Sequence, residues 1–275
     1  GLRRWTNDDV MPRPDDVFQE RLYCIRWSKT VMRDGRPKLV RRYAAPDASD
    51  LAREAQVLAL LRERFIDWQR EGFIPSKGIE SGYNTDQPVR ERGWTHWHHL
   101  FTPRQLLMLG TVWQSVPSQS SQIASVAGAL SIWRATDRLS RLCCLDPHVS
   151  KGPGSIANVF LNQALNTQFS YGCRALHGLM DFLVSDLVFH GEFADHGTVA
   201  TADARDLREI CDLWITDPPY ADAVNYHELS DYFLAWYDKQ LTKAFPGWTP
   251  DARAELAVRG DGDDFRRSMV EIYKN

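Results

Sequence analysis

The stretch Leu213-Trp214-Ile215-Thr216-Asp217-Pro218-Pro219-Tyr220 carries most of the sequence information about the fold. A short apolar run that follows the polar Asp212 is typical of a buried strand in a parallel sheet. The two prolines cannot continue the strand, because each lacks an N–H group and has a fixed φ. We therefore expect Thr216 and Asp217 at the carboxyl end of a strand, with Tyr220 just beyond it. Open α/β sheets bind their ligands at this edge.

The residues at this strand end suit methylation of an exocyclic amine on a nucleic-acid base. Such an amine is a weak nucleophile, because its lone pair is delocalised into the ring. The carboxylate of Asp217 and the backbone carbonyl of Pro218 could accept its two protons, and Pro219 helps to hold both acceptors in place before the substrate arrives. Tyr220 would stack on a base flipped out of its helix. The alternative is a strand that ends in a proline-rich turn without a catalytic role.

Asp217-Pro218-Pro219-Tyr220 resembles motif IV of amino-group DNA methyltransferases, which use S-adenosylmethionine. Residues 216–236, 12–27 and 100–107 are similar to adenine-specific DNA methylases whose full-length members carry a DUF1156 region and a Zn ribbon. The resemblance implies methyl transfer to the N6 amino group of adenine in DNA, in a prokaryotic host-modification or anti-phage setting. Methylation of cytosine N4 remains an alternative, because it uses related sequences. Methylation of cytosine C5 is disfavoured, because it needs a cysteine where Asp217 stands.

A second acid precedes this motif. Residues 198–203 predict a strand that ends in Asp203. In the methyltransferases that the chain resembles, the acid before motif IV contacts the adenine amino group of the cofactor. The resemblance therefore implies that Asp203 and Asp217 both belong to the S-adenosylmethionine site. The alternative for Asp203 is a cap at the end of its strand.

A basic hairpin is predicted near the start of the sequence. Residues 21–27 and 38–44 predict two strands on either side of the turn Asp34-Gly35-Arg36. Residues 21–42 contain eight basic side chains and one acid, although the chain as a whole has a net charge of −3. Such a ribbon could hold the phosphates of DNA, or it could be a solvated face. The expected phosphate contacts are Arg26, Lys29, Arg41 and Arg42.

The middle of the chain predicts helices. Residues 49–71 have apolar positions three and four apart, with Ser49 or Asp50 as the N-cap and Gly72 as the end. Thr102, Pro103 and Gln105 predict the capped start of another helix, and residues 123–144 predict a third. Between the first two lies Trp94-Thr95-His96-Trp97-His98-His99. This run lacks the spacing of common zinc sites, so we expect no metal there and favour aromatic packing or stacking on nucleic acid.

Composition limits the remaining possibilities. The 275 residues are 43% hydrophobic, which is enough for a core, but no run of about 18 apolar residues indicates a membrane span. No secretory leader is visible, and the five cysteines form no CxxC pair, so we expect reduced thiols in a cytoplasmic protein. We divide the chain into an arm with the hairpin (residues 1–48), a mainly helical region (49–190) and a methyltransferase core portion (191–275).

The sequence lacks one expected feature. No glycine-rich turn of the kind that binds S-adenosylmethionine is present, and no further strands follow Tyr220. We therefore expect an α/β fold that holds part of a Rossmann-like class I S-adenosylmethionine methyltransferase sheet, with a helical, hairpin-bearing insertion. Other segments of the same enzyme, or a partner subunit, would complete the cofactor site. The competing interpretation is a non-catalytic DNA-binding or assembly subunit with a degenerate methyltransferase fold.

Overall fold

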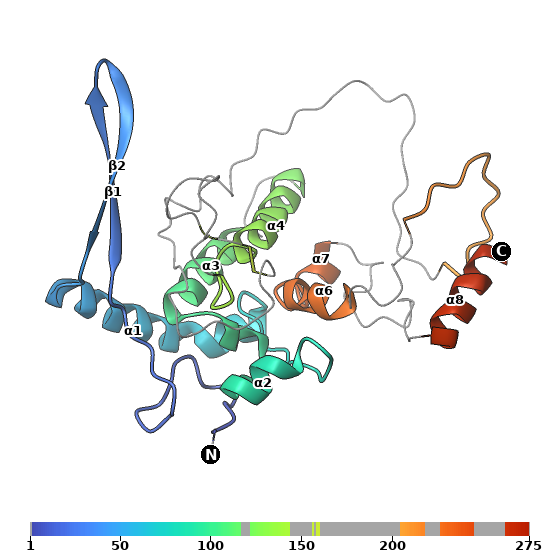
Figure 1. Cartoon of the computed structure of the whole chain (residues 1–275), viewed down its shortest axis with the longest axis horizontal. Coiled ribbons are helices and arrows are strands. Elements are labelled where there is room, and N and C mark those ends of the chain that lie inside the picture. Colours follow the sequence, from blue (N-terminus) through green and yellow to red (C-terminus); the bar gives the residue numbers. More distant parts are fainter. Residues whose placement is uncertain are drawn as a thin grey trace.

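The computed structural model describes residues 2–116, 122–143, 156, 158–159, 204–217, 226–244 and 262–274. The chain combines α-helices with one β-hairpin (Figure 1). Within these ranges the sheet is two-stranded and antiparallel, and no Rossmann-like sheet is present. In chain order the elements are β1 (Ile25–Arg33), β2 (Arg36–Ala44), α1 (Ala48–Glu71), α2 (Asp86–Arg92), the 3-10 helix η1 (Trp97–Leu100), α3 (Pro103–Ser115), α4 (Gln122–Thr136), α6 (Tyr226–Leu234), α7 (Leu241–Ala244) and α8 (Gly262–Lys274).

Helix α1 confirms the helix predicted for residues 49–71. Its N-cap is Asp47, however, not Ser49 or Asp50; Asp50 instead completes a capping box with Asp47. The helix ends as predicted at Gly72, whose φ of 86° lies in the left-handed region. The side chains of Leu61, Phe65 and Trp68 are buried on one side of the helix, whereas Leu51 near its start is exposed. The apolar spacing therefore located the buried side only in the later part of the helix.

Helix α3 begins as predicted. Thr102 accepts a hydrogen bond from the backbone N–H of Gln105, the Gln105 side chain reciprocates, and Pro103 occupies the first turn. Helices α1 and α3 pack closely at Gly110, where an added Cβ atom would lie 2.4 Å from the Trp68 ring. Glycine is therefore required at Gly110 for space.

Helix α4 is shorter than predicted, because it ends at Thr136 and the chain then forms turns. The backbone N–H of Arg141 donates to the carbonyl of Leu100, 2.6 Å away, so this segment joins the core by another path. On α4, Leu130 and Trp133 are exposed whereas Ile132 is buried. The helix is apolar around most of its circumference, so spacing did not distinguish its buried side.

Helix α6 inserts aromatic side chains into the core formed by α1, η1 and α3. Tyr232 and Trp236 are almost fully buried. The Tyr232 ring stacks on Phe101 at 5.7 Å, and its hydroxyl donates to the carbonyl of Thr136 at 2.9 Å. Trp113 Nε1 donates to the carbonyl of Trp236 at 2.8 Å. Segments far apart in the sequence, 96 and 123 residues for these two hydrogen bonds, are thus held together by apolar packing and buried hydrogen bonds.

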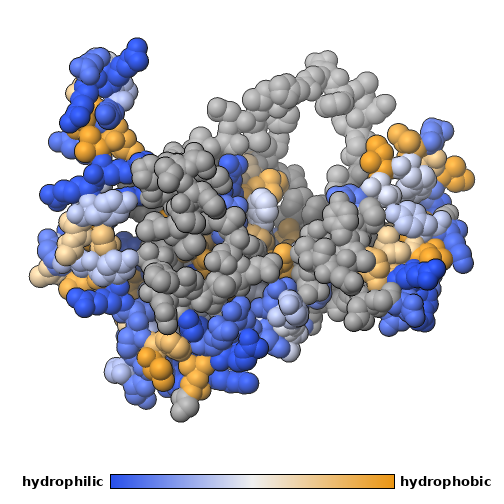
Figure 2. Space-filling view, viewed as in Figure 1, coloured by the Kyte–Doolittle hydropathy of each residue, from blue (hydrophilic) through white to orange (hydrophobic). Residues whose placement is uncertain are grey.

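The hairpin projects away from the helices beside the start of α1 (Figure 1). Figure 2 shows hydrophilic residues over most of this projection, with an apolar patch below its tip. The hairpin was predicted, but β1 runs from Ile25 to Arg33 rather than over residues 21–27. None of the helices that the structure describes is long and apolar enough to cross a membrane.

Candidate functional site

The segment before the two prolines is exposed and has no regular secondary structure. Residues 211–217 form no strand, and every one of them is exposed. Leu213, Trp214 and Ile215 are 74%, 53% and 87% exposed. The buried strand predicted for this run is therefore wrong for the chain as described. A strand of a parallel sheet needs neighbouring strands to pair with its backbone and cover its faces, and the described ranges supply none.

Asp217 is the only member of the predicted site that the structure describes, and its side chain is exposed. Pro218, Pro219, Tyr220 and Asp203 lie outside the described residues. Helix α6 begins at Tyr226, nine residues after Asp217. Nine residues span at most about 30 Å, so the core holds the motif within that distance of the start of α6.

Helix α6 is fixed by two buried acids. Glu228 accepts hydrogen bonds from the backbone N–H groups of Tyr83 and Asn84, at 2.7 and 2.8 Å. Asp231 forms an ion pair with Lys77 and accepts a hydrogen bond from Trp97 Nε1 at 3.0 Å. The helix that follows the motif is therefore held rigidly against the loop before α2 and against η1. The long-range contacts of Glu228 had no local signal in the sequence.

The hairpin is closed by a two-residue turn. Asp34 and Gly35 both have positive φ, 52° and 72°, as the type I′ turn requires. The register pairs Trp27 with Arg42, Lys29 with Val40 and Arg33 with Arg36. Directly paired residues lie on the same face of the ribbon, and successive residues along a strand lie on opposite faces.

This register gives the hairpin two unequal faces. We define the Lys29 face by ten residues: Ile25, Trp27, Lys29, Val31, Arg33, Arg36, Lys38, Val40, Arg42 and Ala44. The Arg26 face consists of the remaining eight: Arg26, Ser28, Thr30, Met32, Pro37, Leu39, Arg41 and Tyr43.

The Lys29 face has five basic residues and the Arg26 face has two, and neither has an acid. The four expected phosphate contacts are therefore divided, with Lys29 and Arg42 on one face and Arg26 and Arg41 on the other. All four are exposed, as predicted for a ligand-binding or solvated position. The alternation of side chains along each strand was the signal that would have divided them in advance.

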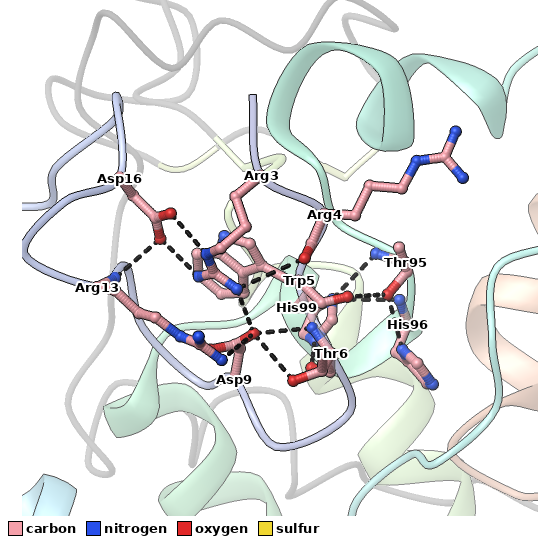
Figure 3. Close-up of polar contacts among 10 residues, drawn as sticks. All are labelled: Arg3, Arg4, Trp5, Thr6, Asp9, Arg13, Asp16, Thr95, His96 and His99. Carbon is pink, nitrogen blue, oxygen red and sulfur yellow. Dashed lines mark hydrogen bonds and ion pairs between the residues drawn. The ribbon is translucent and has the colours of Figure 1, made fainter. Parts of the chain in front are cut away.

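The tryptophan–histidine segment binds the N-terminal arm of the same chain (Figure 3). The Trp5 side chain is buried. The backbone N–H of Trp5 donates to the carbonyl of Gly93 at 2.7 Å, and the backbone carbonyl of Trp5 accepts from the Thr95 hydroxyl at 2.6 Å. The His99 ring accepts at Nδ1 from the backbone N–H of Thr95, 3.0 Å away, and its Nε2 lies 3.0 Å from the carbonyl of Thr6. This pattern requires the neutral tautomer with its proton on Nε2. We considered aromatic packing and stacking on nucleic acid for this segment. The buried contacts show aromatic packing.

Charged residues fold the arm back on itself. Arg3 pairs with Asp9 and Asp16, at 2.6 Å in each case, and Arg13 pairs with Asp9 at 2.9 Å (Figure 3). Burial acts to raise the pKa of Asp9, but hydrogen bonds from Arg3, Thr6 and Arg13 hold it below its ordinary value. The hydrogen bond from Arg3 is also the main reason why the pKa of Asp16 is lowered.

The three histidines of this segment are held in their neutral form. Burial lowers the pKa of His96, and it lowers the pKa of His98 from 6.5 to about 3. Burial also lowers the pKa of His99 far below its ordinary value, with the neighbouring histidines as a further cause. Within the ranges that the structure describes, no group of three or more histidine, cysteine or acidic residues could hold a metal ion. His99 packs in the core and forms hydrogen bonds, whereas His98 makes ring contacts with Phe65 and His99.

Comparison with known proteins gives no relative from which to transfer a function. No protein-family model matches the chain, and no curated protein or solved structure is significantly similar to it.

Proposed function

We propose that this chain carries the motif IV portion of an S-adenosylmethionine-dependent DNA methyltransferase that modifies the N6 amino group of adenine. The observation that carries the proposal is the sequence Thr216-Asp217-Pro218-Pro219-Tyr220, whose Asp217 side chain is open to a ligand. The exposed basic hairpin supports a nucleic-acid substrate, because it concentrates positive charge on a chain that is acidic overall.

The proposed residues have separate roles. Asp217 and the carbonyl of Pro218 accept the two protons of the target amine, and Pro219 restricts the backbone that presents both acceptors. Tyr220 stacks on the flipped base. Asp203 and Asp217 line the site of S-adenosylmethionine, which supplies the electrophilic methyl group when bound.

The exposed apolar run Leu213-Trp214-Ile215 supports the proposal of a sheet completed by other parts. Three large apolar side chains in sequence, each at least half exposed, are unfavourable in water. As a strand of a Rossmann-like sheet, the run would be buried by neighbouring strands and helices. Another segment of the intact enzyme, or a partner subunit, would supply these elements and the glycine-rich turn. A prokaryotic cytoplasmic modification or anti-phage system fits such an enzyme.

A second candidate function is a non-catalytic DNA-binding or assembly subunit. The observation that favours it is that the described ranges contain neither a parallel strand pair nor a glycine-rich cofactor turn. Methylation of cytosine N4 is the alternative within enzymes, because the motif accepts either exocyclic amine.

Asp217→Ala in the intact enzyme tests the proposal. Methyl transfer from tritiated S-adenosylmethionine to unmethylated DNA should be lost, whereas folding should persist, because an exposed side chain leaves no core cavity. The matched control is Asp212→Ala, which removes an exposed acid five residues earlier and should leave the rate unchanged. Wild-type turnover by Asp217→Ala would remove the catalytic assignment and leave the assembly subunit.

Tyr220 provides an independent test of base capture. Tyr220→Ala should weaken binding of the flipped adenine by about 1–3 kcal/mol, the usual contribution of base stacking. Tyr220→Phe and Tyr220→Trp should retain much of the activity, because stacking requires only an aromatic face. Equal losses in all three variants would show that the hydroxyl group, rather than the ring, is required.

A further inference from the structure

We infer that the Lys29 face of the hairpin is a duplex-DNA docking surface that enters the major groove, whereas the Arg26 face points away from the DNA. The inference deepens the proposed function, on which it relies for its DNA substrate. It concerns a surface on a different element from Asp217, so the two can be tested separately.

The positive charge of the Lys29 face has no ion-pair partner among the residues that the structure describes. None of its five basic side chains, Lys29, Arg33, Arg36, Lys38 and Arg42, forms an ion pair with any residue that the structure describes. Arg33 and Arg36 lie directly opposite each other. Like charges in that position destabilise a hairpin. A polyanion that contacts this face would remove the repulsion.

The distribution of the charges matches the two walls of a groove. Lys29 and Arg33 belong to β1, whereas Arg36, Lys38 and Arg42 belong to β2, so both edges of the ribbon are basic. The strands of such a ribbon lie about 4.8 Å apart. The major groove of B-DNA is about 12 Å wide and admits a two-stranded ribbon. Each edge can therefore reach the phosphates of one DNA strand.

Apolar residues alternate with the basic ones on the same face, because each of its three middle cross-strand pairs joins one apolar and one basic residue. Trp27, Val31 and Val40 lie among the basic residues, and Trp27 is 46% exposed. Inside the groove these side chains would meet base edges, where apolar contact with the thymine methyl group is a recognised form of readout. The nine residues of each strand extend over about 30 Å, which is close to one turn of the duplex.

The isolation of the ribbon agrees with a role in binding. The hairpin projects from the helical body, and most of its side chains are exposed on both faces (Figures 1 and 2). Two-stranded hairpins are at best marginally stable without a further layer. Duplex DNA would supply that layer on the Lys29 face and leave the less basic Arg26 face, with Met32, Leu39 and Tyr43, outside the groove.

Two double variants of the full chain separate the faces. Lys29→Gln with Arg42→Gln removes two charges from the Lys29 face, and Arg26→Gln with Arg41→Gln removes two from the other face at neighbouring positions on the same strands. The first variant should bind a duplex oligonucleotide on the order of 30-fold more weakly at 0.15 M salt, and its salt slope should fall by about 1.8. The second should bind like the wild type.

Equal losses of DNA affinity in the two double variants would overturn the assignment of docking to one face. No loss of affinity in either variant would show that the hairpin is a solvated ribbon without a role in DNA binding. A single strand of the same sequence should bind more weakly than the duplex; tighter binding that Trp27→Ala abolishes would indicate base stacking instead of groove docking. Asp212→Ala, which removes an exposed acid that has no proposed role, should retain wild-type duplex affinity and salt slope. If methyl transfer is never observed but the Lys29-face variant alone loses binding, the docking surface stands without the enzyme assignment.

Discussion

Arginine and tryptophan occur together in two regions of this molecule, with opposite consequences. In the core, Arg141 is 2% exposed and its guanidinium lies 5.6 and 5.5 Å from the Trp5 and Trp94 rings. On the hairpin, Arg42 and Trp27 lie opposite each other and are both exposed. Composition alone therefore does not separate a structural cluster from a binding surface. The separation comes from whether the polar groups find partners within the chain.

The core pair has its partners. Arg141 donates to the carbonyl of His99 at 2.5 Å and to the carbonyl of Phe101, and it pairs with Glu20 at 2.5 Å. A buried guanidinium of this kind joins the N-terminal arm, η1 and the turns after α4. Removing it would leave buried carbonyl groups and a charge without partners.

The largest effect should follow from Arg141→Ala. We expect the free energy of unfolding to fall by about 3–5 kcal/mol, as is usual when one partner of a buried charged network is lost. Urea titration followed by tryptophan fluorescence would measure it. Arg141→Met, which fills the volume without the charge, should recover only part of the loss. A loss below about 1 kcal/mol would contradict the structural role, because it would match an ordinary surface substitution.

The second-largest effect should be a loss of stability at acidic pH, caused by the buried histidines. The pKa of folded His98 is about 3 and its ordinary value is 6.5, so the neutral form stabilises the fold. This contribution is complete above pH 6.5 and is lost as the pH falls from 6.5 toward 3. At pH 5 the loss from this residue should be about 2 kcal/mol.

Unfolding curves of the wild type and of His98→Leu between pH 7.5 and 5 would measure this dependence. The variant should lose about half of the pH dependence, because His99 is held neutral in the same way. At pH 7.5 the His98→Leu variant should remain nearly as stable as the wild type, because neither nitrogen of His98 has a hydrogen bond of ordinary geometry. Backbone groups of Asn7 and Asp9 lie close enough to affect the pKa of His98. An unchanged pH profile would refute the assignment.

The smallest effect on stability should come from Arg42→Ala. This side chain is exposed and forms no ion pair with the described residues, so the free energy of unfolding should change by less than about 0.5 kcal/mol. Thermal unfolding followed by circular dichroism would measure it. The result would sharpen the contrast with Arg141: the same residue type is required for folding in one region and free to bind a ligand in the other. A loss as large as that of Arg141→Ala would abolish the distinction.

Local chemistry made some elements predictable. The capping box of Thr102 and Gln105, the left-handed Gly72 and the Asp34-Gly35 turn each depend on residues within a few positions of one another. Their hydrogen bonds and backbone angles are set by neighbours in the chain, so the sequence located them closely. The structure around the predicted site was harder to predict from the sequence, because the expected position of Asp217 depends on neighbouring strands that the described residues do not supply.

The sequence by itself determined the capped helices, the hairpin and its turn, the local concentration of positive charge, and the acid–proline–proline–tyrosine motif, because each is a short-range pattern of residue types. Only the tertiary structure decided that the histidines pack against the N-terminal arm, that Arg141 is buried, that Glu228 holds the loop before α2, and that residues 213–215 are exposed. These outcomes depend on which segments meet in space. Burial and hydrogen-bond partners arise from such long-range contacts, and nearby residues in the chain do not reveal them.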